Sequence, residues 1–393
     1  MLAAEVPSPL KGLLKRFALL LSKPQQDNLA RFVIGFMACE GEKNVKGIGG
    51  SFIPHKDRSA LDRFVIEAKW DYRSLNDRRI SLVEDELGLK DSDECTLIID
   101  DTVVERYGGE GVGYHHDSKH GLVKGHCYVT ELCSCRSVSY PVDLRLYMPE
   151  GTSSKPFRSK VDLACELIDA FKPPSRDVIV AFDEWYLCGG VVKHVEDRGF
   201  QWISEAKSNR VLFLDEERLS VSELISRMRT FFRDVEVDGE LYQCLDIQVY
   251  MPRIRNVRLL FNCRADSKDM HNLCSSIKDL SARDLLKKSF ERAKIESLHW
   301  DIKNTLGFGE YRFRESEAAM IHSHLVLLAY TLLLIMKRRM EKKSPSKSYS
   351  IGDACRWVRD RCLVSLCRWI QDKLDLGVSL KSIIGMIRPH ICT

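Results

Sequence analysis

Two short apolar runs that each stop at an acid constrain the fold more than any other feature of the sequence. Residues 96–100 (TLIID) and 178–183 (VIVAFD) are rich in β-branched side chains, and each is followed by a second acid. Runs of this length and composition are typical of buried strands, and the acid marks the point where each strand reaches the edge of its sheet. The pattern therefore predicts a sheet with aspartates at two strand ends.

The chain between these runs predicts how the two aspartates come together. Residues 124–134 and 140–149 read as two further strands, and residues 159–171 read as a helix. In such a β-β-β-α-β order, a right-handed crossover can place the last strand parallel to and beside the first. We therefore expect an α/β domain in which Asp100 and Asp183 are neighbours.

A third acid lies on an amphipathic helix predicted over residues 288–306. At about 100° per residue, four apolar residues gather on one side of this helix and three charged residues on another. They are Ile295, Leu298, Ile302 and Leu306 on the first side, and Arg292, Glu296 and Lys303 on the second. A solvated surface explains such charge spacing more often, but the two acid-ended strands favour a third carboxylate beside them. Three clustered carboxylates repel one another unless a divalent cation lies between them.

These segments resemble the DDE transposases of prokaryotic insertion sequences, in the IS-four-like group with the signature Y-x2-R-x3-E-x6-K. Arg292, Glu296 and Lys303 match its last three positions, whereas Ser289 stands where the family has tyrosine. IDDT at 99–102 resembles the motif of the first aspartate, and FDEWY at 182–186 that of the second. The similarity covers residues 95–336.

The resemblance implies an α/β fold with a ribonuclease-H-like core, a mixed sheet flanked by helices. It places the catalytic domain at 93–336, with a β-rich insertion at about 200–285. Residues 1–92 would be a helical region that binds terminal inverted repeats, although a helical brace for the core explains their pattern equally well. Residues 337–393 form a basic linker and a helical C-terminal region, which could cap the core or contact a second subunit.

The resemblance also implies the chemistry. Asp100, Asp183 and Glu296 would bind two Mg²⁺ or Mn²⁺ ions and catalyse DNA cleavage followed by strand transfer. Asp100 is preferred to Asp101 because the strand ends there and D-x-S/T is the commoner family form. Arg292 and Lys303 would hold phosphate beside the metals. The partners would be double-stranded DNA, both transposon ends and target, and a second subunit in a homodimer that pairs the ends.

Other cations could also contact DNA. Lys119 and Lys124 lie in the loop predicted over residues 105–126, which we interpret as a polar loop near DNA. The same loop holds His115, His116, Asp117 and His120, for which a metal site is the less favoured alternative. Lys207 and Arg210 lie in the insertion, as does Arg258, although surface charges are common without any such role.

Composition narrows the class of protein without choosing the function. The net charge of +4 permits nucleic-acid binding, and fourteen cysteines without a CxxC pair favour free thiols in a reducing compartment. The apolar run at 325–336 is too short for a membrane span of about twenty residues, so we expect a buried helix, no membrane partner and a nucleoid-associated protein in the cytoplasm. A nuclease that cuts without joining, or a non-catalytic DNA-binding descendant, remain the alternatives.

Overall fold

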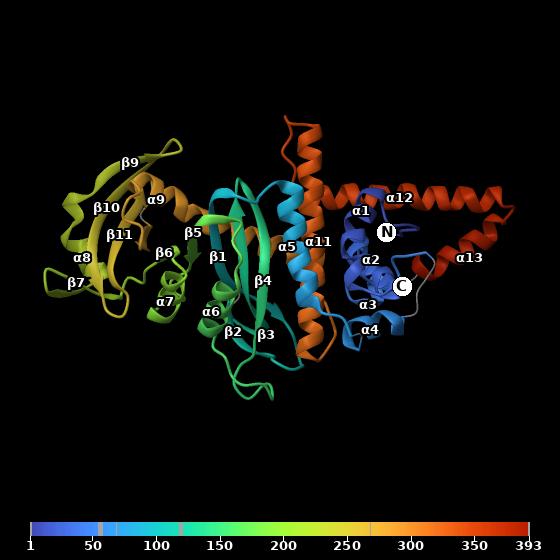
Figure 1. Cartoon of the computed structure of the whole chain (residues 1–393), viewed down its shortest axis with the longest axis horizontal. Coiled ribbons are helices and arrows are strands. Elements are labelled where there is room, and N and C mark those ends of the chain that lie inside the picture. Colours follow the sequence, from blue (N-terminus) through green and yellow to red (C-terminus); the bar gives the residue numbers. More distant parts are fainter. Residues whose placement is uncertain (1, 54–57, 68, 118–120, 268, 392–393) are drawn as a thin grey trace.

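The computed structural model describes residues 2–53, 58–67, 69–117, 121–267 and 269–391. In Figure 1 the β-rich insertion lies at one end, the central sheet lies beside the upright helices α5 and α11, and the remaining N-terminal and C-terminal helices lie at the other end.

The helices are α1 (Ser8–Leu14), α2 (Lys23–Ala38), α3 (Val45–Gly49), α4 (Arg58–Ile66), α5 (Tyr72–Leu87), α6 (Lys160–Ala170), α7 (Gly189–Asp197), α8 (Val221–Arg227), α9 (Ala282–Ser289), α10 (Lys294–Leu306), α11 (Ser316–Lys343), α12 (Ile351–Asp375) and α13 (Leu380–Ile391), with 3-10 turns η1 (Lys15–Leu20), η2 (Arg229–Phe231) and η3 (Phe290–Ala293).

The strands form one mixed sheet in the order β2-β3-β1-β5-β6-β12-β11-β10-β7-β8, with β4 paired to β3 and β9 paired to β10. The strands are β1 (Ser92–Glu105), β2 (Gly113–Asp117), β3 (Gly121–Cys135), β4 (Val138–Tyr147), β5 (Ser175–Phe182), β6 (Gln201–Glu205), β7 (Val211–Leu214), β8 (Glu217–Ser220), β9 (Arg233–Val237), β10 (Glu240–Met251), β11 (Arg255–Arg264) and β12 (Met270–Ser275). The insertion therefore extends the core sheet through β6 and β12 and is not a separate sheet.

The core strands follow the predicted β-β-β-α-β order. β1 pairs antiparallel with β3 and parallel with β5, and α6 makes the crossover between β4 and β5. Leu97, Ile98 and Ile99 are all fully buried in β1. Consecutive strand residues point to opposite faces, so a continuous apolar run of this kind requires helices on both faces of the sheet.

The segment at 105–126, predicted to be a loop, contains strand β2, so that prediction was wrong in part. Residues from Gly113 to Asp117 pair antiparallel with residues Gly125 to Gly121 of β3. The glycines that suggested a loop lie mainly at the ends of this hairpin, whereas Tyr114, His115 and His116 occupy its paired interior. Lys119 and His120 lie outside the described residues.

Helix α11 joins the sheet to the helical regions. It spans 28 residues and is apolar enough, by length and composition, to cross a membrane, but its most apolar window is entirely buried inside the protein. α11 packs against α2, α4, α5 and α12, and also against β4. The buried helix predicted from residues 325–336 is confirmed, but α11 runs from Ser316 to Lys343, so the predicted linker was wrong for residues 337–343. α2, α4 and α5 of the N-terminal region pack on α11, and the two interpretations of that region, DNA binding and a brace, both stay predictions.

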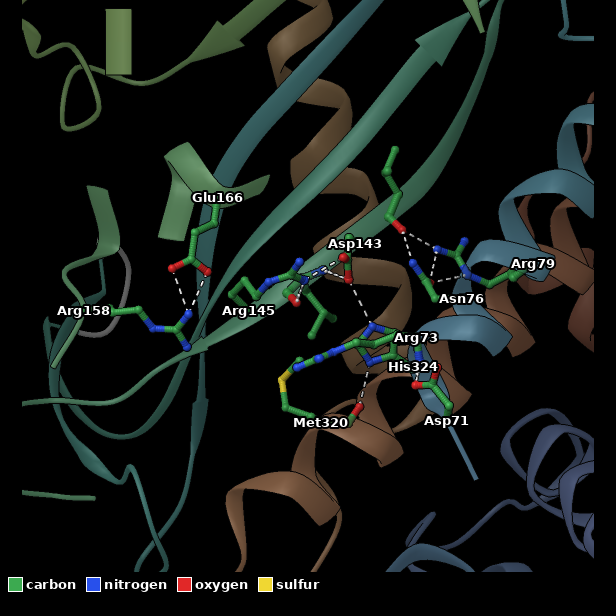
Figure 2. Close-up of polar contacts among 12 residues, drawn as sticks. Asp71, Arg73, Asn76, Arg79, Asp143, Arg145, Arg158, Glu166, Met320 and His324 are labelled. Carbon is green, nitrogen blue, oxygen red and sulfur yellow. Dashed lines mark hydrogen bonds and ion pairs between the residues drawn. The ribbon is translucent and has the colours of Figure 1, made fainter. Parts of the chain in front are cut away.

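A buried arginine ties α5 to the sheet and to α11. The Arg79 guanidinium donates to the carbonyl oxygens of Pro141 and Val142 at 2.6 Å, to Asn76 Oδ1 and to Thr331 Oγ1. Figure 2 shows Arg79 and Asn76 beside the β4 backbone. Burial lowers the pKa of Arg79 to about 10, so it stays charged at neutral pH, and its hydrogen bonds compensate the desolvation of that charge.

A second polar contact between α11 and β4 lies nearby. Asp143 of β4 accepts from Arg145 at 2.6 Å and lies 3.0 Å from His324 Nε2 of α11 (Figure 2). Hydrogen bonds and the charges of these two partners outweigh burial and hold the pKa of Asp143 below its usual range. Both contacts fix α11 against the sheet behind the acid-ended strands.

Candidate active site

Asp100 and Asp183 lie at adjacent positions on neighbouring parallel strands. In the β1–β5 register Ile99 lies opposite Phe182, so the next residue on each strand is the predicted acid. β5 ends at Phe182 as predicted, whereas β1 continues to Glu105, so the prediction that the first strand stops at Asp100 was wrong. Asp183 Oδ1 accepts from the backbone N–H groups of Trp185 and Tyr186 at 3.0 and 3.3 Å. These bonds turn the chain sharply and hold the Asp183 carboxylate at the strand end.

The carboxylates of Asp100 and Asp183 are both desolvated, and little positive charge lies near them to compensate. Burial raises the pKa of Asp100 to about 7, and the negative charges of Asp183 and Asp101 add to the rise. Burial also raises the pKa of Asp183. Arg292 is the cation beside them, with its Nη1 3.9 Å from Asp100 Oδ2. A desolvated carboxylate pair of this kind is a donor set suited to a hard divalent cation, which would lower both pKa values.

Asp101 points to the other face of the sheet and already has partners. Its Oδ2 atom accepts from Lys160 Nζ at 2.7 Å and from Cys127 Sγ at 3.2 Å, and its Oδ1 atom accepts from the Tyr186 hydroxyl at 3.1 Å. Tyr186 is fully buried, so this bond links the second acidic motif to the first. The prediction that Asp101 points to the other face is confirmed, and the choice of Asp100 as the ligand stays a prediction.

Glu296 is placed differently from the two aspartates. The predicted apolar side of α10 is buried, but Glu296 is exposed on α10, one turn beyond Arg292 of η3. The second Arg292 nitrogen, Nη2, lies 3.8 Å from Glu205 Oε1. Within the described ranges, no group of three histidine, cysteine or acidic side chains is close enough together to hold a metal ion. The structure thus brings Asp100, Asp183 and Arg292 together and leaves the Glu296 carboxylate outside that group.

The other predicted DNA contacts have diverse surroundings. Lys207 lies 4.0 Å from Glu184 and over the exposed Trp185 ring at 5.5 Å, close to Asp183. Lys124 is exposed and lies 5.9 Å from the Tyr114 ring, and Lys303 is half-buried on α10.

Two of the arginines have structural partners. Arg210 donates to the Leu187 carbonyl at 2.8 Å. The prediction that Arg258 lines DNA was wrong, because its side chain is buried and makes a bidentate ion pair with Asp246. Such a pair is the usual way to keep a guanidinium inside a protein.

The two described histidines of β2 lie on different faces of the strand. His115 is buried and its Nε2 lies 3.2 Å from the Gly125 carbonyl oxygen, whereas His116 is exposed. Burial lowers the pKa of His115. The two side chains leave opposite faces of the strand, so they cannot ligate the same ion. This excludes a shared site for the described pair.

A cavity of 540 Å³ opens beside Arg292, between η3 and the strands of the insertion. Ser289 and Phe290 line it from the helical side, and Tyr242 and His271 line it from the strands. Ser289 donates its hydroxyl to the Leu286 carbonyl at 2.7 Å. The residue at the signature's tyrosine position is therefore engaged with its own helix.

Sequence reasoning missed several residues of this site. Tyr186 falls within the FDEWY motif and could have been found there as a buried partner for an acid. Lys160 and Thr130 carry no pattern, because their partners Asp101 and Asp100 are distant in sequence. His299 follows Glu296 by three residues, and this helical spacing could have placed it on the charged side of α10.

Comparisons with known proteins agree with this arrangement. Residues 16–226, which are 211 of 393 residues, match the family described as DDE superfamily endonuclease. The match includes both aspartates and ends before Glu296. No curated protein matches the chain.

Among solved structures, the chain resembles the piggyBac transposase in a synaptic complex with hairpin DNA, at 13% identity and a TM-score of 0.51, over 97% of this chain and 80% of that one. It also matches the Drosophila P element transposase in a strand transfer complex, at 11% identity and a TM-score of 0.24, over 91% and 71% of the two chains. The first likeness shows the fold, so the predicted α/β fold with a ribonuclease-H-like core is confirmed.

Proposed function

The chain belongs to the DDE endonuclease superfamily, and on that premise we propose that it is the transposase of a prokaryotic insertion sequence of the IS-four-like group. In this proposal it binds the terminal inverted repeats of its element, cleaves DNA there and joins the ends to target DNA. The observation that carries the proposal is the pair Asp100 and Asp183, which lie in register on adjacent parallel strands in a desolvated setting.

The residues that would hold the metal are Asp100, Asp183 and Glu296. Enzymes of this superfamily generally use divalent ions, and we propose two Mg²⁺ or Mn²⁺ ions. When bound, two such ions activate the attacking oxygen and stabilise the leaving oxygen of a phosphodiester. The raised pKa of Asp100 supports this role, because a carboxyl of this kind gains most from a nearby cation. The backbone N–H groups of Trp185 and Tyr186 keep the Asp183 carboxylate in place.

The basic residues around the aspartates would bind the anionic DNA backbone. Arg292 lies 3.8 to 3.9 Å from its carboxylate neighbours. These distances are too long for strong hydrogen bonds, so its N–H groups can turn to a phosphate. Lys303 of α10 and Lys207, which follows β6, would add further contacts to the DNA backbone. Lys124, Lys119 and Arg210 are assigned to flanking DNA, where contacts to phosphate position the duplex without reading its sequence.

The piggyBac transposase that this chain resembles is in a synaptic complex with hairpin DNA, which supports DNA as the partner, and we propose double-stranded transposon ends and target DNA. We propose a homodimer that pairs the two transposon ends, acting in the cytoplasm on nucleoid DNA. The exposed Glu296 and the serine at position 289 favour one second candidate, a DNA-binding descendant that no longer cuts.

The deciding experiment measures cleavage and strand transfer on labelled DNA that carries the element's own ends. The wild type is compared with Asp100→Ala, Asp183→Ala and Glu296→Ala, with Mg²⁺ or Mn²⁺ and with EDTA. Asp177→Ala, which changes an exposed acid of β5, the strand that ends just before Asp183, is the matched control. We expect joined products from the wild type and the control alone, only with metal, while all five proteins bind the ends.

Other outcomes identify other functions. Cleavage without joined products would favour a nuclease, and binding without any cleavage would favour the non-catalytic descendant. Full activity in one of the three site variants would show that its carboxylate is not a ligand.

A further inference from the structure

A half-buried histidine connects the helix that carries Glu296 to the strand that carries Asp100. His299 Nε2 lies 2.7 Å from Thr130 Oγ1, and Thr130 Oγ1 donates to the Asp100 carbonyl oxygen at 3.0 Å. A hydroxyl has one proton to donate, and here it goes to the carbonyl. The histidine must therefore donate through Nε2, which makes a continuous chain of two hydrogen bonds from α10, through β3, to the backbone of Asp100.

These two hydrogen bonds lie on the face of the sheet that carries the Asp100 side chain. Thr130 stands directly opposite Asp100 in the β1–β3 register, and so shares its face of the sheet. His299 follows Glu296 by three residues and precedes Lys303 by four, so the three side chains lie along one side of α10. His299 is thus the described residue of this side that is hydrogen-bonded to the sheet at Asp100.

The His299–Thr130 hydrogen bond gives α10 a directional contact, which its apolar side does not provide. Ile295, Leu298 and Ile302 bury the helix against the core, but apolar contacts are non-directional, and a helix held by them alone can shift or rotate slightly. A hydrogen bond has a narrow range of distance and angle. Burial, with a contribution from the Lys303 charge, lowers the pKa of His299 to about 3. The ring is therefore neutral and needs a hydrogen-bond partner rather than a counter-ion.

We propose that His299 is a positioning residue, which through Thr130 fixes the rotation and height of α10 on β1 and so sets where the Glu296 carboxylate stands relative to Asp100. This inference rests on the proposed function, because it assigns Glu296 a role beside the two aspartates. A residue that only filled the core would stabilise the fold without setting the position of that carboxylate.

The test uses the full chain and four variants. His299→Leu keeps the bulk and removes the donor, Thr130→Val removes the hydroxyl, the double variant removes both, and His299→Gln restores an amide donor. His194→Leu, at a half-exposed histidine of α7 paired with Asp169, is the matched control. Three quantities are measured: Mn²⁺ affinity of the DNA-free protein by electron paramagnetic resonance, kcat and KM for cleavage of labelled ends, and thermal stability.

We expect His299→Leu and Thr130→Val each to weaken Mn²⁺ binding and to lower kcat by about 10- to 100-fold, the range typical of residues behind metal ligands. KM for DNA should stay within about threefold, since the phosphate contacts remain. His299→Gln should recover most of the loss. The double variant should be no worse than the worse single variant, because both substitutions break the same chain.

The inference is overturned if the variants melt earlier but keep wild-type Mn²⁺ affinity and kcat at a temperature where they are folded, since that describes a core histidine. It is also overturned if the losses of the two single variants simply add. If substituting Glu296 abolishes cleavage but substituting His299 does not affect it, this inference alone is contradicted. A wild type that neither binds Mn²⁺ nor cleaves DNA would sink the proposed function together with it.

Discussion

The two aspartates and the glutamate of the candidate site are held by different kinds of structure. Asp100 and Asp183 stand on hydrogen-bonded parallel strands, so their separation is set by the β1–β5 register. The Asp100 side chain is 18% exposed. Glu296 is exposed on a helix whose position depends on packing and on the His299–Thr130 hydrogen bond.

This difference has consequences for energy as well as position. The strand-borne pair carries unfavourable desolvation and repulsion in the metal-free protein, as the raised pKa values of both acids show. An exposed carboxylate on a helix carries little of either. Metal ligands on the strands therefore destabilise the metal-free fold but are fixed in position. A ligand on the helix destabilises the fold little, but its position can change.

The largest expected effect separates activity from stability. Asp183→Asn and Glu296→Gln should both reduce cleavage by more than the roughly 10- to 100-fold typical of residues behind the ligands. Only Asp183→Asn should also change stability without metal, by relieving repulsion on Asp100. Glu296→Gln should stay within about 0.5 kcal/mol of the wild type, as exposed substitutions usually do.

Single-turnover cleavage assays and urea unfolding in EDTA measure the two quantities on the same samples. Asp177→Asn, which changes an exposed acid on β5, should leave both unchanged. A Glu296→Gln protein that cleaves normally would remove Glu296 from the site and restrict the ligands to the strand pair.

The second largest expected effect is a pH dependence of the free energy of unfolding, caused by the titration of Asp100. Its pKa is about 3.9 in an unfolded chain and about 7 in the fold. Between these values the folded protein keeps a proton that the unfolded chain releases. The resulting stability is fully present below about pH 4 and is lost as the pH rises through 7. Asp100→Asn carries no charge in either state, so relative to the wild type it should gain up to about 4 kcal/mol by pH 8.

Urea unfolding of both proteins in EDTA, from pH 4 to pH 8, gives this difference directly. The same series with Asp177→Asn should run parallel to the wild type. Parallel curves for Asp100→Asn would mean that the carboxyl is already ionised at low pH, and that the strand pair is not strained in the way the structure indicates.

The sequence was sufficient for the strand-borne half of the site and insufficient for the rest. The apolar runs before Asp100 and Asp183, together with the right-handed crossover, determine that these residues are neighbours. The orientation of Asp101 also followed from strand alternation. The exposure of Glu296 did not, because helical spacing places a residue on a side of a helix without fixing how that helix docks.

Contacts between residues far apart in the chain left no pattern to find. Lys160 with Asp101, and His299 with Thr130, join segments separated by 59 and 169 residues. The length of α11 was underestimated for a related reason. His322, Ser323 and His324 interrupt its apolar run, yet all three are buried. Ser323 bonds to a carbonyl of its own helix, and His324 bonds to Asp143.

The smallest expected effect tests the other face of β1. Tyr186→Phe removes the hydroxyl that donates to Asp101 and leaves the Lys160 ion pair intact. A hydrogen bond to a charged group contributes about 1.5–3 kcal/mol, so urea unfolding should show a loss of that size. Cleavage should fall less than about tenfold, because Asp100 and Asp183 keep their places in the β1–β5 register. Tyr107→Phe, at a side chain that is 87% exposed, should change neither quantity.

The opposite result would exchange the roles of the two adjacent acids. If Tyr186→Phe kept its stability but lost cleavage, the hydroxyl would be acting on the reaction through Asp101, and Asp101 rather than Asp100 would belong to the site. Tyr186 and Lys160 would then be orienting a ligand instead of compensating a buried charge. The structure argues against this exchange, because Asp101 has three side-chain donors within 3.2 Å, whereas Asp100 accepts one backbone N–H at 2.8 Å and its ion-pair partner among the described residues is an arginine at 3.9 Å. The carboxylate with fewer donors is the one with more lone pairs left for a metal ion.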